Sequence, residues 1–197
     1  MQDSWAHVGR LWTNGEPYLA VDAALRDAWH GFSKDEFDQV VELGWQDTSI
    51  PVGVGRAVIV GGDGVVRDDS WIEVFEATSG PVALVQAAGS DYPDVLARAL
   101  SYPDAEDEDG DTLNVRSGEL ATFSAAVDGA GQHSMPLLAA RSGPVPPVHG
   151  PPSREEDSGL LFSTEHSAYK LKIRWYTELG EDSCFARWLL IPVQAND

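Results

Sequence analysis

The sequence has very few of the residues from which catalytic and metal sites are commonly built. Cys184 is the only cysteine among 197 residues, which excludes an internal disulfide and a metal site made of several cysteines. No base that could activate this thiol is evident, so we expect a small buried apolar residue rather than a nucleophile. The five histidines never occur at metal-ligand spacing, and we predict neither a metal nor a cofactor unless they converge in space.

Long apolar runs are also missing. The longest are Ala57–Val60 and Pro81–Ala88, and the second is interrupted by Gln86, whereas a membrane-spanning helix needs about 20 apolar residues. The first residues, Met1–Trp5, lack the basic and apolar regions of a signal peptide. We therefore expect a cytoplasmic protein that has no membrane partner.

Positive charge is scarce as well. The chain holds 13 Lys and Arg against 32 Asp and Glu, which gives a net charge of -19. A general nucleic-acid-binding protein needs a basic surface against the phosphates, so we expect no direct binding of nucleic acid. An acidic protein of this kind is instead steered electrostatically toward a basic partner.

Recognisable catalytic motifs are absent from the sequence. It contains no nucleophile elbow, H-E-x-x-H helix, phosphate-binding loop or kinase signature. Gly53–Gly55 matches only the first half of a dinucleotide fingerprint, and it precedes a strand where that motif needs a helix. We expect a protein that is not an enzyme. Two alternatives stay open: an enzyme or small-molecule-binding domain whose site converges only in three dimensions, and an adaptor of a secretion or phage-like particle.

The clearest local signal is an acidic helix over residues 33–44. Ser33 and Glu36 have the spacing of a capping box, in which each side chain accepts from the backbone N–H of the other residue. Phe32 and Phe37 have the spacing of a hydrophobic staple, which packs one side chain on the other at the start of a helix. Together these features predict a helix that begins at Ser33.

Three carboxylates of this predicted helix, Asp35, Asp38 and Glu42, fall at i, i+3 and i+7. That spacing places them along one line of the face opposite the apolar residues. Charged residues usually lie in solvent, so one interpretation is a solvated face. The other interpretation is a docking stripe for a basic partner.

The apolar patterns along the chain predict an α+β fold. We expect two or three short helices and a mostly antiparallel sheet in the N-terminal half, then a β-rich C-terminal half that ends in a hairpin. Residues 1–197 are expected to form a single domain, which can be subdivided into 1–103 and 112–197 at an acidic loop, 104–111. Trp5 and Trp12 are expected near a mobile terminus, where they can lie on the surface.

The individual elements follow from caps, turn residues and apolar periodicity. The predicted helices are 22–31, capped by Asp22, then 33–44 and Tyr92–Leu100. The predicted strands are a short one before Asp22, then Arg56–Gly61, Trp71–Ala77, Pro81–Ala88, Thr112–Arg116, Glu119–Val127, Met135–Arg141 and Leu160–Thr164, followed by the hairpin strands Tyr169–Glu178 and Cys184–Val193. Gly143–Pro152 is expected to be an irregular or polyproline-like loop.

Residues 104–111 hold six acids in eight positions. A calcium loop anchored on the glycine of this stretch would place Ala105 and Arg116 where carboxylates are required, so that template fails. We predict a mobile acidic loop. Its carboxylates are further candidates for binding a partner: Glu106, Asp107, Glu108, Asp109 and Asp111.

Three cations alternate with apolar residues in the first strand of the predicted hairpin. The period of two places Lys170, Lys172 and Arg174 on one face of that strand. In so acidic a chain we expect them to pair with acidic neighbours or to protect an exposed strand surface. A binding site for an anion or an acidic partner is the alternative.

Several short stretches occur in a distinctive order along the first half of the chain. They are Gly15–Leu19, Trp29–Gly31, Glu36–Asp38, and Ile50–Gly55 before an apolar strand that ends in Gly62-Asp63. In this order, residues 12–100 resemble the immunity protein 21 family of bacterial polymorphic toxin systems. The resemblance implies a cytoplasmic α+β protein, made beside a secreted or contact-delivered toxin, that protects the cell by stoichiometric binding. The family has no catalytic residues to transfer.

Charge and resemblance together predict a non-enzymatic immunity protein that neutralises a cognate toxin domain through an acidic surface. Many toxin domains that act on nucleic acid, such as nucleases, are basic, and an acidic face can occupy their phosphate-binding cleft. The carboxylates expected to bind first are Asp35, Asp38 and Glu42, followed by those of 104–111.

Overall fold

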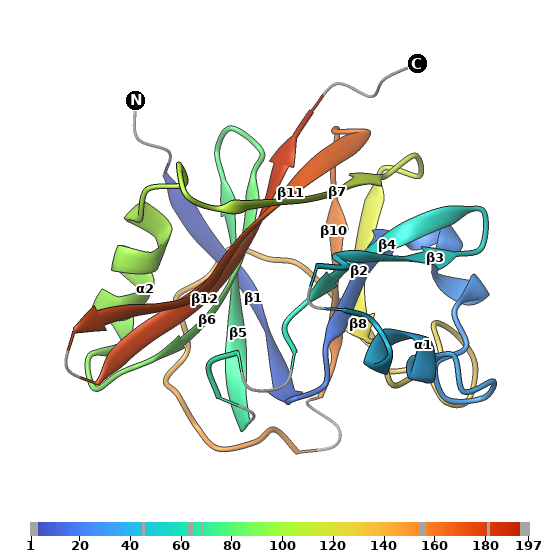
Figure 1. Ribbon diagram of the computed structural model, residues 1–197, viewed down its shortest axis with the longest axis horizontal. Coiled ribbons are helices and arrows are strands. Elements are labelled where there is room, and N and C mark those ends of the chain that lie inside the picture. Colours follow the sequence, from blue (N-terminus) through green and yellow to red (C-terminus); the bar gives the residue numbers. More distant parts are fainter. Residues whose placement is uncertain are drawn as a thin grey trace.

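Two six-stranded sheets face each other across one apolar core in the computed structural model (Figure 1). The structure describes residues 4–44, 46–62, 65–67, 69–153, 157–180 and 182–193. Strands far outnumber helices, and the predicted α+β class is confirmed. Asp63, the last residue of the motifs quoted for the family resemblance, lies outside the described residues.

The first sheet, sheet A, is antiparallel between every pair of neighbouring strands. Its strands in spatial order are β1 (Trp5–Asn14), β5 (Asp69–Ala77), β6 (Val82–Ala88), β12 (Ser183–Pro192), β11 (Ala168–Gly180) and β7 (Glu108–Asn114). β1 was not predicted: Trp5 and Trp12 belong to a strand on the edge of this sheet, which pairs with β5. The hairpin of β11 and β12 confirms the prediction for the end of the chain.

The second sheet, sheet B, is antiparallel except where β9 runs parallel to β10. Its strands in spatial order are β3 (Ser49–Val52), β4 (Gly55–Val60), β2 (Tyr18–Asp22), β8 (Glu119–Ser124), β10 (Gly159–Ser163) and β9 (Leu137–Ala139). Each sheet takes three strands from before residue 104 and three from after it. Both halves of the chain therefore contribute to the same core.

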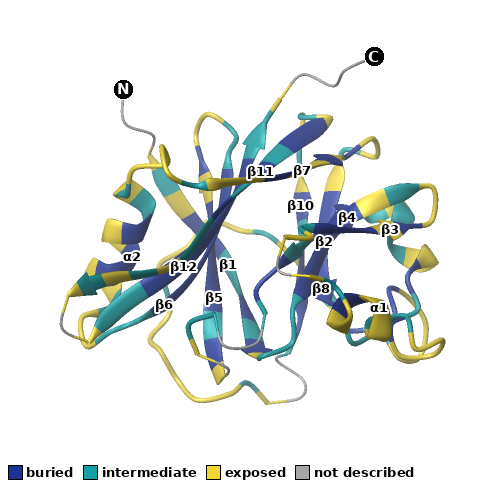
Figure 2. Cartoon of the chain, viewed as in Figure 1, coloured by how far each residue is buried: buried dark blue, intermediate teal, exposed yellow. Residues whose placement is uncertain are grey.

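The core lies between the inner faces of the two sheets. Trp188, Leu84 and Ile72 project into it from sheet A, and Leu19 and Phe123 project into it from sheet B. Each of these side chains is removed from water, and full burial of such a group stabilises the fold by about 1.5–3 kcal/mol. Figure 2 shows this burial along the central strands.

The longest helix, α2 (Tyr92–Ser101), packs on the outer face of sheet A over β6 and β12. Asp91 accepts from the backbone N–H of Asp94 and so caps its start. Val95, Leu96 and Ala99 form its buried stripe. This helix agrees with the prediction over Tyr92–Leu100.

The helix predicted over 22–31 is a short 3₁₀ helix, η1 (Ala23–Ala28). Asp22 caps it as predicted, because its carboxylate accepts from the N–H of Ala24. Burial alone would raise the pKa of Asp22, but hydrogen bonds from Ser117, Ala24 and Arg116 outweigh it and lower that pKa.

The helix predicted over 33–44 is reduced to one turn, α1 (Phe37–Val41). The capping box is wrong: Glu36 accepts from the N–H of His30 instead, at 2.7 Å. The staple is wrong too, since Phe32 is 59% exposed. The physical reason is a competing hydrogen-bond acceptor that lies far away in the sequence. Asp128, which follows β8 in the chain, accepts from the N–H groups of Phe32 and Ser33 and holds them in a turn.

Candidate protein-binding surface

Residues 31–44, which we term the acidic segment, carry four Asp and Glu against one Lys. Asp35, Asp38 and Glu42 are all exposed, as a partner-binding role would require. They do not share one helical line, however, because Asp35 precedes α1 and has a φ of 54°. Only Asp38 and Glu42, four residues apart, remain on one face of that turn.

Two large apolar side chains of the acidic segment are also exposed. Phe32 is 59% exposed and Val41 is 68% exposed. Val41 lies three residues after Asp38 and directly before Glu42, so it is flanked by carboxylates. Exposed apolar side chains that are surrounded by charged side chains are typical of a protein interface. In such an interface an apolar centre is bordered by a polar rim.

The exposure of this apolar pair could not be predicted from local patterns, because Phe32 and Phe37 have the spacing of a staple. In the structure the ring of Phe32 lies against the ring of His133, with 4.5 Å between the centroids. The signal that could have identified it is Asp128, but that residue is 96 positions away from Phe32.

The acidic segment is held in place by buried groups of the core. Asp128 is buried, and its Oδ1 accepts from Phe32 at 3.0 Å and from Ser33 at 2.9 Å. Burial would raise the pKa of Asp128, but these hydrogen bonds and the neighbouring His133 lower it. Just before the segment, the buried indole of Trp29 donates to the carbonyl of Ala125 at 3.0 Å. The exposed carboxylates therefore project from a fixed backbone.

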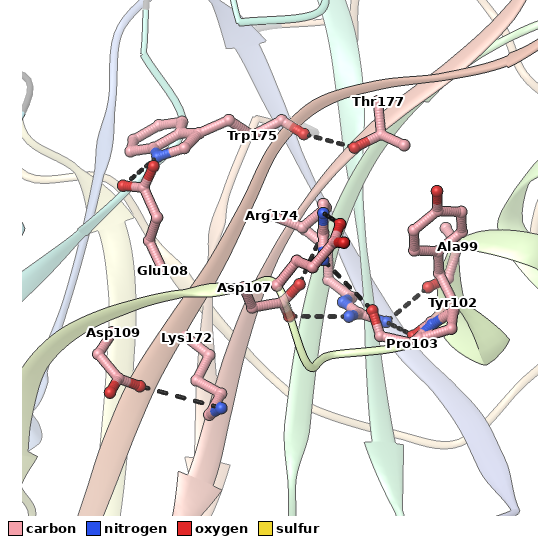
Figure 3. A network of polar contacts seen from close by, with 12 residues as sticks. Ala99, Tyr102, Pro103, Asp107, Glu108, Asp109, Lys172, Arg174, Trp175 and Thr177 are labelled. Atoms are coloured by element: carbon pink, nitrogen blue, oxygen red, sulfur yellow. Dashed lines mark hydrogen bonds and ion pairs between the residues drawn. The ribbon is translucent and has the colours of Figure 1, made fainter.

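The second group of candidates, residues 104–111, is not a free loop. β7 begins at Glu108, and the carboxylate of Asp107 is completely buried between two guanidinium groups (Figure 3). Asp107 accepts from Arg174 at 2.7 Å and from Arg187 at 2.8 Å. Asp107 is thus unavailable to a partner, and the prediction that its carboxylate binds one is wrong.

Four other predicted carboxylates of 104–111 also have partners within the chain: Glu106, Glu108, Asp109 and Asp111. Glu106 lies 3.5 Å from Arg174, Asp109 lies 3.9 Å from Lys172, and Glu108 accepts from the indole of Trp175 at 2.9 Å. These contacts confirm that Lys172 and Arg174 pair with acidic neighbours.

Asp111, the last of these acids, accepts from the hydroxyl of Ser49 at the start of β3. Its own backbone N–H donates to Thr48 at 2.9 Å. In Figure 1, β7 crosses the upper part of the molecule, whereas α1 lies at the lower right. The two sets of predicted residues therefore lie on different elements of the fold.

A buried charged cluster on the outer face of sheet A was not predicted. Glu73 of β5 is completely buried, and its carboxylate contacts Arg10 and accepts from Tyr92 at 3.2 Å. It also lies 2.8 Å from Nε2 of His7. Burial and the adjacent carboxylate raise the pKa of Tyr92. The only local signal in the sequence is Glu73 between apolar neighbours of β5. Its partners His7 and Arg10 come from β1, more than 60 residues away.

The proline-rich segment 143–152 crosses this face as the predicted irregular loop, exposed along most of its length (Figure 2). Arg10 donates to the carbonyls of Pro146 at 2.9 Å and Pro147 at 3.2 Å. The indole of Trp71 donates to the carbonyl of His149 at 3.2 Å. A cavity of about 410 Å³ remains between this segment and the edge of the sheets.

Two further properties concern only the described part of the chain. It contains no group of three or more His, Cys, Asp or Glu side chains that could hold a metal ion. Within the same residues, no helix has the length and apolar character needed to cross a membrane.

Comparisons with known proteins supply no relative for this architecture. The resemblance to the immunity protein 21 family therefore stays a prediction that rests on the residues quoted for it. No family model, no curated protein and no solved structure matches the chain.

Proposed function

We propose that the protein is a non-enzymatic immunity protein that binds a cognate bacterial toxin domain and neutralises it through the acidic segment. The observation that carries the proposal is the exposure of Phe32 and Val41 among the carboxylates of Asp35, Asp38 and Glu42. Apolar groups supply binding energy when they are buried, and the surrounding charges select a basic partner.

The two kinds of side chain would act at different stages of binding. A net charge of -19 attracts a basic domain from a distance, and this raises the association rate. Burial of Phe32 and Val41 then slows dissociation, since most affinity differences between related complexes reside in that rate. A toxin domain that binds nucleic acid would present its basic phosphate-binding cleft to these carboxylates, so occupation of the cleft would block its substrate.

The acidic segment suits this role because its backbone is already ordered. Asp128 and Trp29 hold it from the core side, so little conformational entropy would be lost when a partner binds. Interfaces of pre-organised complexes usually move little between the free and bound states.

The proposal is tested by co-expressing the protein with the toxin domain encoded by the neighbouring gene, followed by size-exclusion chromatography of the mixture. We expect rescue of growth and a stable complex that elutes as one species. Toxicity without rescue, together with separate elution of the two proteins, would refute the proposal.

A further inference from the structure

The cavity beside the proline-rich segment has the size and lining of a small-molecule site. Its volume of about 410 Å³ lies within the range of ligand pockets. Trp12 and Trp71 line it and lie edge to face, with 5.1 Å between their ring centroids. Val8, Leu138 and Leu160 add an apolar wall. Such a lining suits the aromatic or aliphatic body of a small molecule.

One polar group of the lining lacks an internal partner. Oδ1 of Asp157 is buried and has no hydrogen-bond partner within the described part of the chain. Burial raises the pKa of this carboxyl. A buried acceptor that is left unsatisfied costs about 1–3 kcal/mol, so its presence calls for an explanation. A ligand that donates a hydrogen bond into the cavity would supply one.

The charges around the cavity indicate the sign of that ligand. The guanidinium of Arg10 is already paired with the buried carboxylate of Glu73 and with two backbone carbonyls. Negative charge gathers close to Asp157. Burial is the main cause of the raised pKa of Tyr18, and the nearby carboxylates of Asp157 and Glu16 raise it further. Arg141, the other cation of the lining, is exposed to solvent. The buried end of the cavity thus favours a positive group.

We propose that this cavity binds a small organic cation, in which an ammonium group pairs with Asp157 and an aromatic or aliphatic body packs on Trp12 and Trp71. A hydrogen bond to an ionised carboxylate is about twice as strong as a neutral one, and the tryptophan rings offer a large apolar surface to the body of the ligand. This site is separate from the acidic segment and does not depend on the proposed immunity function.

Three probes of similar size but different charge test the proposal on the unmodified protein: 2-phenylethylammonium, neutral 2-phenylethanol and anionic 3-phenylpropionate. We expect isothermal titration calorimetry near pH 7 to detect binding of the ammonium, with the other two bound at least about tenfold more weakly. The ammonium should also change the tryptophan fluorescence.

Two variants then assign the binding to its residues. Asp157→Asn should weaken binding of the ammonium about tenfold, whereas the matched control Arg141→Gln should leave it unchanged or tighten it. Equal affinity for all three probes, or no binding of any, would overturn the proposal. Preference for 3-phenylpropionate that is lost in Arg141→Gln would also overturn it, since the cavity would then be an anion site. The probe comparison needs no variant, so it decides even if a variant fails to fold.

Discussion

Two acidic stretches of this protein, residues 31–44 and 104–111, have different surroundings in the structure. The carboxylates of Asp35, Asp38 and Glu42 project into solvent, whereas those of Glu106, Asp107, Glu108 and Asp109 contact cations and donors of neighbouring strands. The difference is that β11 and β12 bring Arg174, Lys172 and Arg187 beside the second stretch. A run of acids is therefore a candidate binding surface only where the fold brings no cation or hydrogen-bond donor beside it.

The largest effect in this comparison should come from removing the buried carboxylate. Asp107→Asn leaves Arg187, whose side chain is 3% exposed, without its anionic partner. Breaking a buried ion pair in this way costs about 3–5 kcal/mol. We expect that loss in the free energy of unfolding, measured with urea.

The matched control is Asp38→Asn, which alters an exposed acid of the acidic segment. It should change the free energy of unfolding by no more than about 0.5 kcal/mol. If both variants were equally stable, the contrast between the two stretches would be wrong.

Phe32→Ala should have the next largest effect, on binding rather than folding. Truncation of a central aromatic group at an interface commonly costs about 2 kcal/mol or more, so the Kd for the toxin domain should rise about 30-fold. Surface plasmon resonance would measure it, with Val148→Ala as the control because Val148 is 54% exposed on the proline-rich segment. An unchanged Kd in Phe32→Ala would place the interface elsewhere.

Reversing the charges of Asp35, Asp38 and Glu42 to Lys should lower the association rate about tenfold and flatten its dependence on salt. Stopped-flow measurements over a range of ionic strength would detect both changes. The control reverses three exposed acids elsewhere, Glu119, Glu165 and Glu178, and so alters the net charge equally. A similar slowing in both triple variants would mean that only overall charge matters.

The smallest effect concerns the group that holds the acidic segment. The pKa of Asp128 is lowered in the folded state, so its contribution to stability is present above the unfolded pKa of about 3.9 and is lost as the pH falls through the folded pKa. Asp128→Asn should therefore reduce the free energy of unfolding by about 1 kcal/mol at pH 7 and by less in acid. Thermal unfolding between pH 2 and pH 7 would test this, and a pH-independent loss would contradict it.

Much of the architecture follows from local patterns. The apolar stretch around Pro81–Ala88 is β6, the terminal alternation is the hairpin of β11 and β12, and the capped helix is α2. Where the prediction failed, a distant residue had overridden a local preference. Asp128 replaced the capping box at Ser33, and pairing with β5 made a strand of residues 5–14.

The candidate sites were less predictable than the fold. The sequence correctly singled out Asp35, Asp38 and Glu42 as exposed, yet it could not separate them from Asp107, because composition does not show which acid a distant cation will meet. The cavity beside Trp12 and Trp71 had no local signal at all, since its walls come from widely separated parts of the chain.

The sequence by itself determined the α+β class, the main strands, the excess of negative charge and the outward face of Lys172 and Arg174, because these depend on composition and on periodicities of a few residues. Only the tertiary structure decided which acids stay free, which apolar groups stay exposed and where a cavity forms. Those outcomes depend on which distant groups meet, and a buried carboxylate or hydrogen-bond donor takes the partner that the packed strands bring to it.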